Sequence, residues 1–120
     1  MQRKLEEAAT LEEKALQKRR QVLGNDHPQT LTSMVSLAMI YQKQGKLAEA
    51  VALEEEVLPN LKLIRGNQHP DTLWTMDNLA SIYRIQGRTQ EAATLQEVLG
   101  KIKAQKEGQT IVRQIPLRNL

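Results

Sequence analysis

The sequence predicts an all-α protein, a solenoid of about two and a half helix pairs stacked side by side. Three observations predict this fold class: a repeat with a period of 42 residues, proline and glycine where helices should begin and end, and apolar residues spaced three and four apart. One helix pair cannot bury its apolar face alone, so neighbouring pairs must stack to form a shared core. At 120 residues the chain is long enough for one such core.

The repeat is found by aligning residues 24–58 with residues 66–100. The two segments begin with similar motifs, GNDHP and GNQHP, and 17 of their 35 aligned positions are identical without a gap. Chance would produce only a few such identities. Each unit of the repeat is therefore expected to be one helix pair.

The same period locates the two ends of the array. Shifted back by 42 residues, segment 47–53 falls on segment 5–11 with matching residues, so the chain opens on the second half of a unit. Shifted forward, Ile111 stands where His69 would recur, and the repeat stops. We therefore expect a helical repeat domain over 1–107, made of a half repeat 3–23 and repeats 24–65 and 66–107, followed by a basic C-terminal tail 108–120.

Local signals divide each unit into two helices. Pro28 and Pro70 suit the first turn of a helix, where a missing N–H costs nothing. Gly45 and Gly87 suit the tight turn that ends this first helix. The predicted helices span 3–23, 28–44, 46–65, 70–86 and 88–105. Pro59, inside the third of them, is expected to kink or shorten it.

The composition excludes several classes of protein. There is no cysteine, which rules out a disulfide framework and a thiolate metal site. The N-terminal segment is charged from its third residue and does not resemble a secretory signal. No window approaches the roughly 18 apolar residues of a membrane span. We expect a cytoplasmic protein with no membrane partner.

The net charge of +3 is unevenly distributed. Residues 101–120 hold five basic residues and one acidic residue, so the first hundred residues carry one net negative charge. A repeat domain that is close to neutral lacks the basic surface that follows a phosphate backbone. We therefore expect no nucleic-acid partner.

No group of residues in the sequence forms a plausible active site. His27 and His69, the two histidines, occupy the same position of consecutive units, which predicts a structural role. No cysteine, carboxylate or third histidine stands at ligand spacing beside them, and no glycine-rich phosphate loop occurs. The acidic run Glu54–Glu56 is expected to be a solvated helix face. The protein is predicted not to be an enzyme and to need no metal or cofactor.

The repeated residues resemble the tetratricopeptide repeat (TPR). The motif G-x-x-H-P-x-T-L-x-x-M-x-x-L-A-x-x-Y-x-x-Q-G-[KR]-x-x-E-A stands at 24–50 and 66–92, with a partial copy at 2–16. In its long period the chain is similar to the repeats of kinesin light chains and of many fungal NTPase-plus-repeat proteins. The resemblance implies a right-handed α-α superhelix whose first helices line a concave groove that receives peptide segments.

The resemblance also places candidate peptide-binding residues at the variable positions of the two first helices. They are Thr32, Val35, Ser36, Met39, Gln42, Lys43, Trp74, Asp77, Asn78, Ser81, Arg84 and Ile85. Asn78 matches the position where kinesin-light-chain-like units carry an Asn that can hold a peptide backbone, whereas Ser36 departs from that pattern. Trp74 either anchors a ligand or packs as partly buried core. The motif residues Leu37, Tyr41, Leu79 and Tyr83 are expected in the core.

The expected function is a protein- or peptide-binding scaffold module, part of a longer array or a multidomain signalling protein. The alternative is self-association through the repeat ends. Helix 3–23 lacks a preceding helix, and exposed apolar stripes invite association into a homodimer; the stripe comprises Leu5, Ala8, Ala9, Leu11, Ala15 and Leu16. The tail 108–120 is expected to be disordered or to lie back along the last helix pair.

Overall fold

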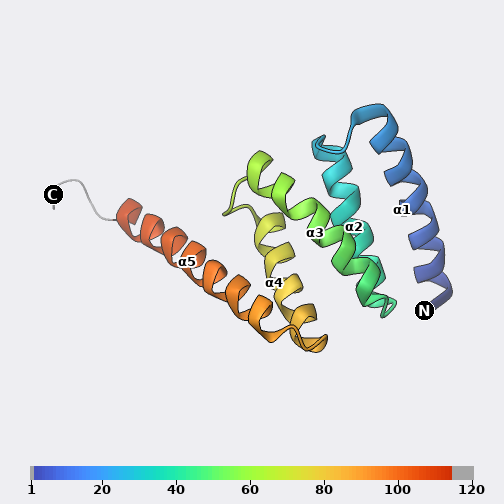
Figure 1. The fold of residues 1–120 in the computed structure, drawn as a ribbon. Coiled ribbons are helices and arrows are strands. Elements are labelled where there is room, and N and C mark those ends of the chain that lie inside the picture. The colour runs from blue at the N-terminus through green and yellow to red at the C-terminus, as the bar shows by residue number, and fades with distance from the viewer. Residues whose placement is uncertain (1, 115–120) are drawn as a thin grey trace.

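The computed structural model describes residues 2–114, with side chains described for residues 2–108, as five helices in antiparallel succession (Figure 1). These are α1 (Gln2–Leu23), α2 (Pro28–Lys43), α3 (Leu47–Ile64), α4 (Pro70–Ile85) and α5 (Thr89–Gln114). No strand occurs in residues 2–114. The all-α fold class is confirmed.

The repeated His-Pro dipeptide begins both first helices. His27 Nδ1 accepts a hydrogen bond from the backbone N–H of Gln29, and His69 Nδ1 accepts one from Asp71, each at 3.1 Å. Each histidine is the N-cap, in extended backbone conformation, and a proline without an N–H follows in the first turn. The predicted structural role of the histidines is confirmed.

The glycine turns after α2 and α4 are also equivalent. Gly45 and Gly87 have φ angles of 78° and 79°, the left-handed region in which a β-carbon would be strained. The next N–H reaches back into the helix: Lys46 N donates to Tyr41 O at 2.8 Å, which satisfies a carbonyl of the last turn. This turn holds the residue after each glycine close to the tyrosine of the preceding helix.

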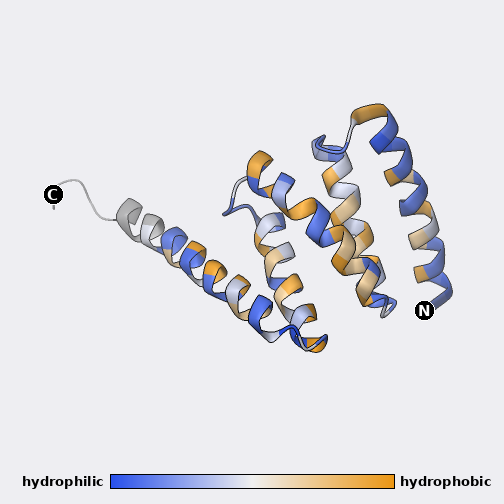
Figure 2. Ribbon diagram, in the orientation of Figure 1, coloured by the Kyte–Doolittle hydropathy of each residue, from blue (hydrophilic) through white to orange (hydrophobic). Residues whose placement is uncertain are grey.

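Two clusters of buried residues form the core, and α3 contributes to both. One joins α1, α2 and α3 through Ala9, Leu16, Leu31, Met34, Val35, Leu37, Val57 and Leu61. The other joins α3, α4 and α5 through Ala50, Val51, Leu58, Met76, Leu79, Ile82, Tyr83, Ala92, Leu99 and Ile102. Hydrophobic residues accordingly gather along α2, α3 and α4, whereas α1 and α5 are more hydrophilic (Figure 2).

The apolar stripe of α1 is largely covered within the chain. Ala9 and Leu16 are buried against α2 and α3, and Leu5 is half-buried. Of the large side chains in the stripe, only Leu11 is well exposed, at 69%. The expectation that α1 lacks a cover is therefore wrong, although the homodimer through this helix stays an untested prediction.

Helix α3 lies close to its predicted bounds, whereas α5 is longer than predicted. Pro59 does not shorten α3, which continues for five residues beyond it to Ile64. The last helix runs to Gln114 instead of ending near residue 105, so the backbone over 108–114 is helical and continues α5. Segment 101–107, which leads into this stretch, is rich in helix-forming Lys, Gln, Ala and Glu, and the one glycine, Gly108, costs only roughly 1 kcal/mol. Residues 115–120 of the predicted tail lie outside the described residues.

Candidate peptide-binding groove

The candidate groove is built on α2 and α4, the first helices of the two full units. Each is packed between second helices: α2 between α1 and α3, and α4 between α3 and α5 (Figure 1). The predicted core positions follow this packing. Leu37, Leu79 and Tyr83 are buried, and Tyr41 is partly buried against both clusters.

The six candidates on α2 differ in accessibility. Thr32, Met39 and Lys43 are exposed, and Ser36 and Gln42 are half-buried. Val35 is only 9% exposed and belongs to the core cluster of α1, α2 and α3. The Val35 side chain therefore packs in the core and has almost no accessible area for contact with a ligand.

Trp74 and Arg65 connect the beginnings of α2 and α4. Trp74 is half-buried and packs against the cluster that includes the α2 core residues. Arg65 Nη2 donates to Thr32 Oγ1 at 3.1 Å and to Pro28 O at 3.2 Å, and its Nη1 lies 3.4 Å from Asp71 Oδ2. Arg65 thus links the N-terminal ends of α2 and α4. The Thr32 hydroxyl already accepts a hydrogen bond from it. The repeat could not predict this link, because the counterpart of Arg65 one unit earlier is Leu23.

Asn78 is hydrogen-bonded to the buried carboxyl group of Glu54. Its Nδ2 donates to Glu54 Oε1, and Glu54 is 0% exposed, with no partner for Oε2 among the described residues. Burial raises the pKa of Glu54 to about 7, partly offset by the hydrogen bond from Asn78. The prediction of a solvated acidic run is therefore wrong for Glu54, although Glu55 and Glu56 are exposed.

The hydrogen bond to Glu54 fixes what Asn78 can offer a ligand. The Glu54 carboxyl group accepts a hydrogen bond from the Asn78 amide nitrogen. The Asn78 amide oxygen points elsewhere and can accept a hydrogen bond from a ligand. A peptide N–H is a suitable donor. The one sequence signal for this support is that position 54 falls on the apolar stripe of its helix, which indicates the face that Glu54 is on but not that α4 covers it.

The far ends of α2 and α4 expose apolar and basic side chains. Met39 is 39% exposed and Ile85 is 70% exposed. Lys43 and Arg84 are exposed as well, and Arg84 Nη2 donates to the Gln96 amide oxygen at 2.9 Å in the amide orientation that satisfies both groups. The remaining candidates, Asp77 and Ser81, are exposed and half-buried respectively.

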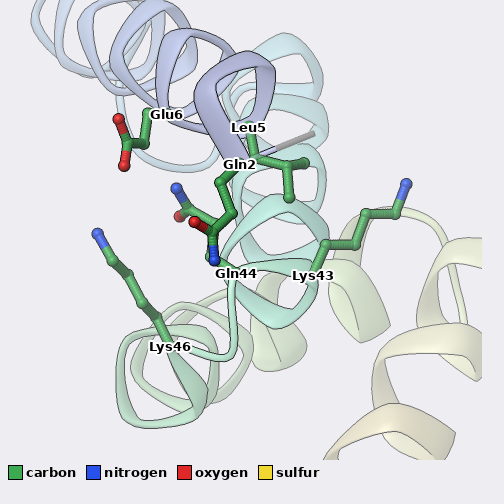
Figure 3. Close-up of a pocket in the computed structure, with 6 residues that line it drawn as sticks. All are labelled: Gln2, Leu5, Glu6, Lys43, Gln44 and Lys46. Atoms are coloured by element: carbon green, nitrogen blue, oxygen red, sulfur yellow. The ribbon is translucent and has the colours of Figure 1, made fainter.

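A small recess of about 210 Å³ lies at the edge of this surface, where α1 begins and α2 ends (Figure 3). Lys43 and Lys46 line it but extend in different directions, and the Glu6 carboxylate lies on the side of Lys46 (Figure 3). The two cations do not converge on one point, so the recess does not form an anion site. Among the described residues, no three His, Asp or Glu side chains are grouped to hold a metal ion, and no helix is both long and apolar enough to cross a bilayer.

Comparison with known proteins identifies the family. The chain matches the tetratricopeptide repeat model over residues 1–63, and a second tetratricopeptide repeat model over residues 72–99. The chain belongs to the tetratricopeptide repeat family. TPR proteins are in general scaffolds that mediate protein interactions and lack catalytic chemistry.

Solved structures support the same assignment. The TPR solenoid is similar to the crystal structure of a candidate kinesin light chain from Podosopora anserina with nearly identical TPR-like repeats, at a TM-score of 0.75 and 33% identity. The Q17M form of that protein matches with a TM-score of 0.75 and 34% identity. Each match covers 85% of this chain, which spans 48% of the related chain. No curated protein matches the sequence.

Proposed function

We propose that the chain is a cytoplasmic protein-binding scaffold module that holds a short peptide segment of a partner protein across α2 and α4. The observation that carries the proposal is the exposure of Met39 and Ile85 on these two first helices. Exposed apolar side chains offer a ligand area that it can bury on binding. The proposal also fits a module within a longer array, since the match covers only 48% of the related chain.

The other candidate side chains along α2 and α4 suggest the chemistry of the ligand. Half-buried Trp74 offers a rigid aromatic surface to an apolar residue, and aromatic anchors are common at interface hot spots. The Asn78 amide oxygen can accept from a peptide N–H. Lys43 and Arg84 favour an acidic residue in the ligand. We infer a short segment with one or two apolar residues next to an acidic one.

Peptide selection on the immobilised chain tests the proposal. Selected peptides should combine apolar and acidic residues, and Ile85→Asp should weaken their binding at least tenfold. The matched control is Leu63→Asp, because Leu63 is 83% exposed but lies on a second helix outside the candidate surface. Equal loss in both variants, or unchanged binding in Ile85→Asp, would overturn the proposed site.

A further inference from the structure

Two recesses lie between successive second helices, and the repeat relates them residue by residue. The first lies between α1 and α3 over α2, and the second between α3 and α5 over α4, with volumes of about 430 and 510 Å³. Each of the nine residues lining the first has its counterpart 42 positions later in the second. None of the twelve candidate groove residues lines either recess. These recesses are therefore a surface separate from the candidate groove.

Both recesses have an apolar floor and a tyrosine bonded to a rim glutamate. Leu16, Leu37 and Leu53 contribute to the floor of the first. Tyr41 Oη donates to Glu13 Oε1 at 2.8 Å, and its counterpart in the second recess bonds a glutamate at 2.5 Å. Burial and these glutamates raise the pKa of both tyrosines to about 12, so both hydroxyls remain donors at neutral pH.

The two recesses differ in how their acidic rims are neutralised. In the second, Arg88 lies 4.1 Å from the Tyr83 ring centroid and pairs with both rim acids, Glu91 at 2.6 Å and Glu55 at 3.6 Å. Its rim is therefore compensated by a cation of the same chain that lies beside the recess.

In the first recess the corresponding cation, Lys46, lies 5.8 Å from its tyrosine ring, and no ion pair joins it to Glu13 or Glu49 among the described residues. Arg20 on the same rim is already paired with Glu56 at 2.5 Å. The first recess thus presents an apolar floor between two carboxylates that lack a paired cation in the described part of the chain.

The sequence contains one segment whose chemistry complements this recess. Residues 111–118 hold Ile111, Val112, Ile115 and Leu117 together with Arg113 and Arg118, and no acidic residue. The candidate groove suits it less well, because its exposed charges include Lys43 and Arg84 against Asp77 alone. Apolar burial and charge both favour the first recess.

The segment cannot reach either recess of its own chain. Helix α5 leads away from α1, α2 and α3 (Figure 1). Leu95 in the second recess and Gln114 at the end of α5 are separated by about 28 Å of helix, at 1.5 Å per residue. The four residues from 115 to 118 can span at most about 14 Å when fully extended. An occupant from this segment must therefore come from a second copy.

We propose that segment 111–118 of one copy binds in the first recess of another, its arginines facing Glu13 and Glu49 and its apolar side chains covering Leu16, Leu37 and Leu53. The contact is between different surfaces of the two copies, so it either closes reciprocally into a dimer or extends into longer assemblies. The peptide-binding surface of α2 and α4 stays free. The inference does not depend on the proposed function.

Sedimentation equilibrium of the full chain over a concentration series tests the inference. The wild type should associate reversibly, and Glu49→Arg should weaken association at least tenfold, as should Arg113→Glu combined with Arg118→Glu. Combining all three reversals should restore association at least partly. Glu49 is exposed to solvent, so its reversal should not unfold the chain. Glu7→Arg, on an exposed part of α1 outside the recess, is the matched control and should associate like the wild type.

A labelled peptide of residues 109–120 provides an independent measurement. It should bind the full chain, compete with self-association, and lose binding to Glu49→Arg but not to Glu7→Arg. A chain that stays monomeric and does not bind the peptide would refute the proposal. The proposal would also be refuted if association persisted in all three reversals but disappeared in Leu11→Asp, since that result would assign the contact to the exposed Leu11 of α1.

Discussion

Helices α3 and α5 occupy the same place in consecutive repeats but have different surroundings. Helix α3 packs against α2 on one side and α4 on the other, and six of its residues are buried. Helix α5 packs against α4, and only Ala92, Leu99 and Ile102 are buried in its part with described side chains. Position 54 is a fully buried Glu in α3, while its counterpart Gln96 in α5 is exposed. The repeat sets which face a residue is on, and the neighbouring helices decide whether that face is buried.

The largest expected difference between the two helices concerns core packing. Leu61 in α3 is 0% exposed, and Leu61→Ala should lower the free energy of unfolding by about 3 kcal/mol because it leaves a cavity. Leu95→Ala in α5 should lower it by about 1 kcal/mol, since Leu95 is only half-buried. Urea unfolding followed by circular dichroism measures both. Equal losses would contradict the comparison.

The buried carboxyl group of α3 should make stability depend on pH. The pKa of Glu54 is about 7 in the folded chain, above its ordinary value of 4.5, so the folded state keeps a proton that the unfolded state releases. Stability should therefore fall as pH rises from about 4.5 to about 7. Glu54→Gln should remove this fall and raise the free energy of unfolding at pH 8 by about 2 kcal/mol. Unfolding curves at several pH values measure it.

The matching change in α5 serves as the control for this pH dependence. Gln96→Glu places a carboxyl group at the exposed counterpart of position 54, where water and the Arg84 guanidinium both favour its charged form. Its effect should be within about 0.5 kcal/mol at every pH. A wild type with no fall in stability between pH 4.5 and 7 would show that Glu54 is hydrated in solution.

Ionic contacts at the end of α3 should contribute more to stability than those on the surface of α5. Arg65, at the end of α3, bridges the first turns of α2 and α4, so Arg65→Ala should cost about 1 kcal/mol. Lys101 pairs with Glu97 on the surface of α5 at 3.5 Å, and both side chains are largely exposed. Lys101→Ala should change stability by about 0.3 kcal/mol or less. Thermal unfolding distinguishes the two, and a larger effect at Lys101 would reverse their order.

One substitution in α5 is expected to stabilise the chain. Gly100 lies inside α5, and a β-carbon added there would have no neighbouring atom within 4 Å, so Gly100→Ala should raise the free energy of unfolding by about 0.7 kcal/mol. The same change at Gly87, where φ is 79°, should instead destabilise the chain by about 1 kcal/mol. If both substitutions destabilise, Gly100 has a role beyond the helix.

The sequence was sufficient wherever a local signal determines the structure. The caps at His27 and His69 and the turns at Gly45 and Gly87 depend on the backbone near each residue, and the helix boundaries followed from them. The period of 42 then predicted the stacking of helix pairs.

The sequence was insufficient where the outcome depends on which helix lies opposite. Glu54 is charged and was expected in solvent, but α4 covers it. Val35 sits at a variable position and was expected on the surface, but it is enclosed by the core cluster against which Trp74 packs. Arg65, at the end of α3, contacts both α2 and α4, and these two helices belong to different repeats. The ligand-binding role of the twelve candidate residues stays a prediction.

The succession of packing contacts has a consequence for how the chain can change length. Within residues 2–114, every pair of helices with an extensive contact is consecutive along the chain: α1 with α2, α2 with α3, α3 with α4, and α4 with α5. Contacts between consecutive helices join residues that are close in the sequence. Such contacts favour fast folding, which can start in any repeat and spread to its neighbours. A further 42-residue unit inserted between α3 and α4 would meet the same kind of surface on both sides. Duplication of a unit could therefore lengthen the protein without redesign of the units already present.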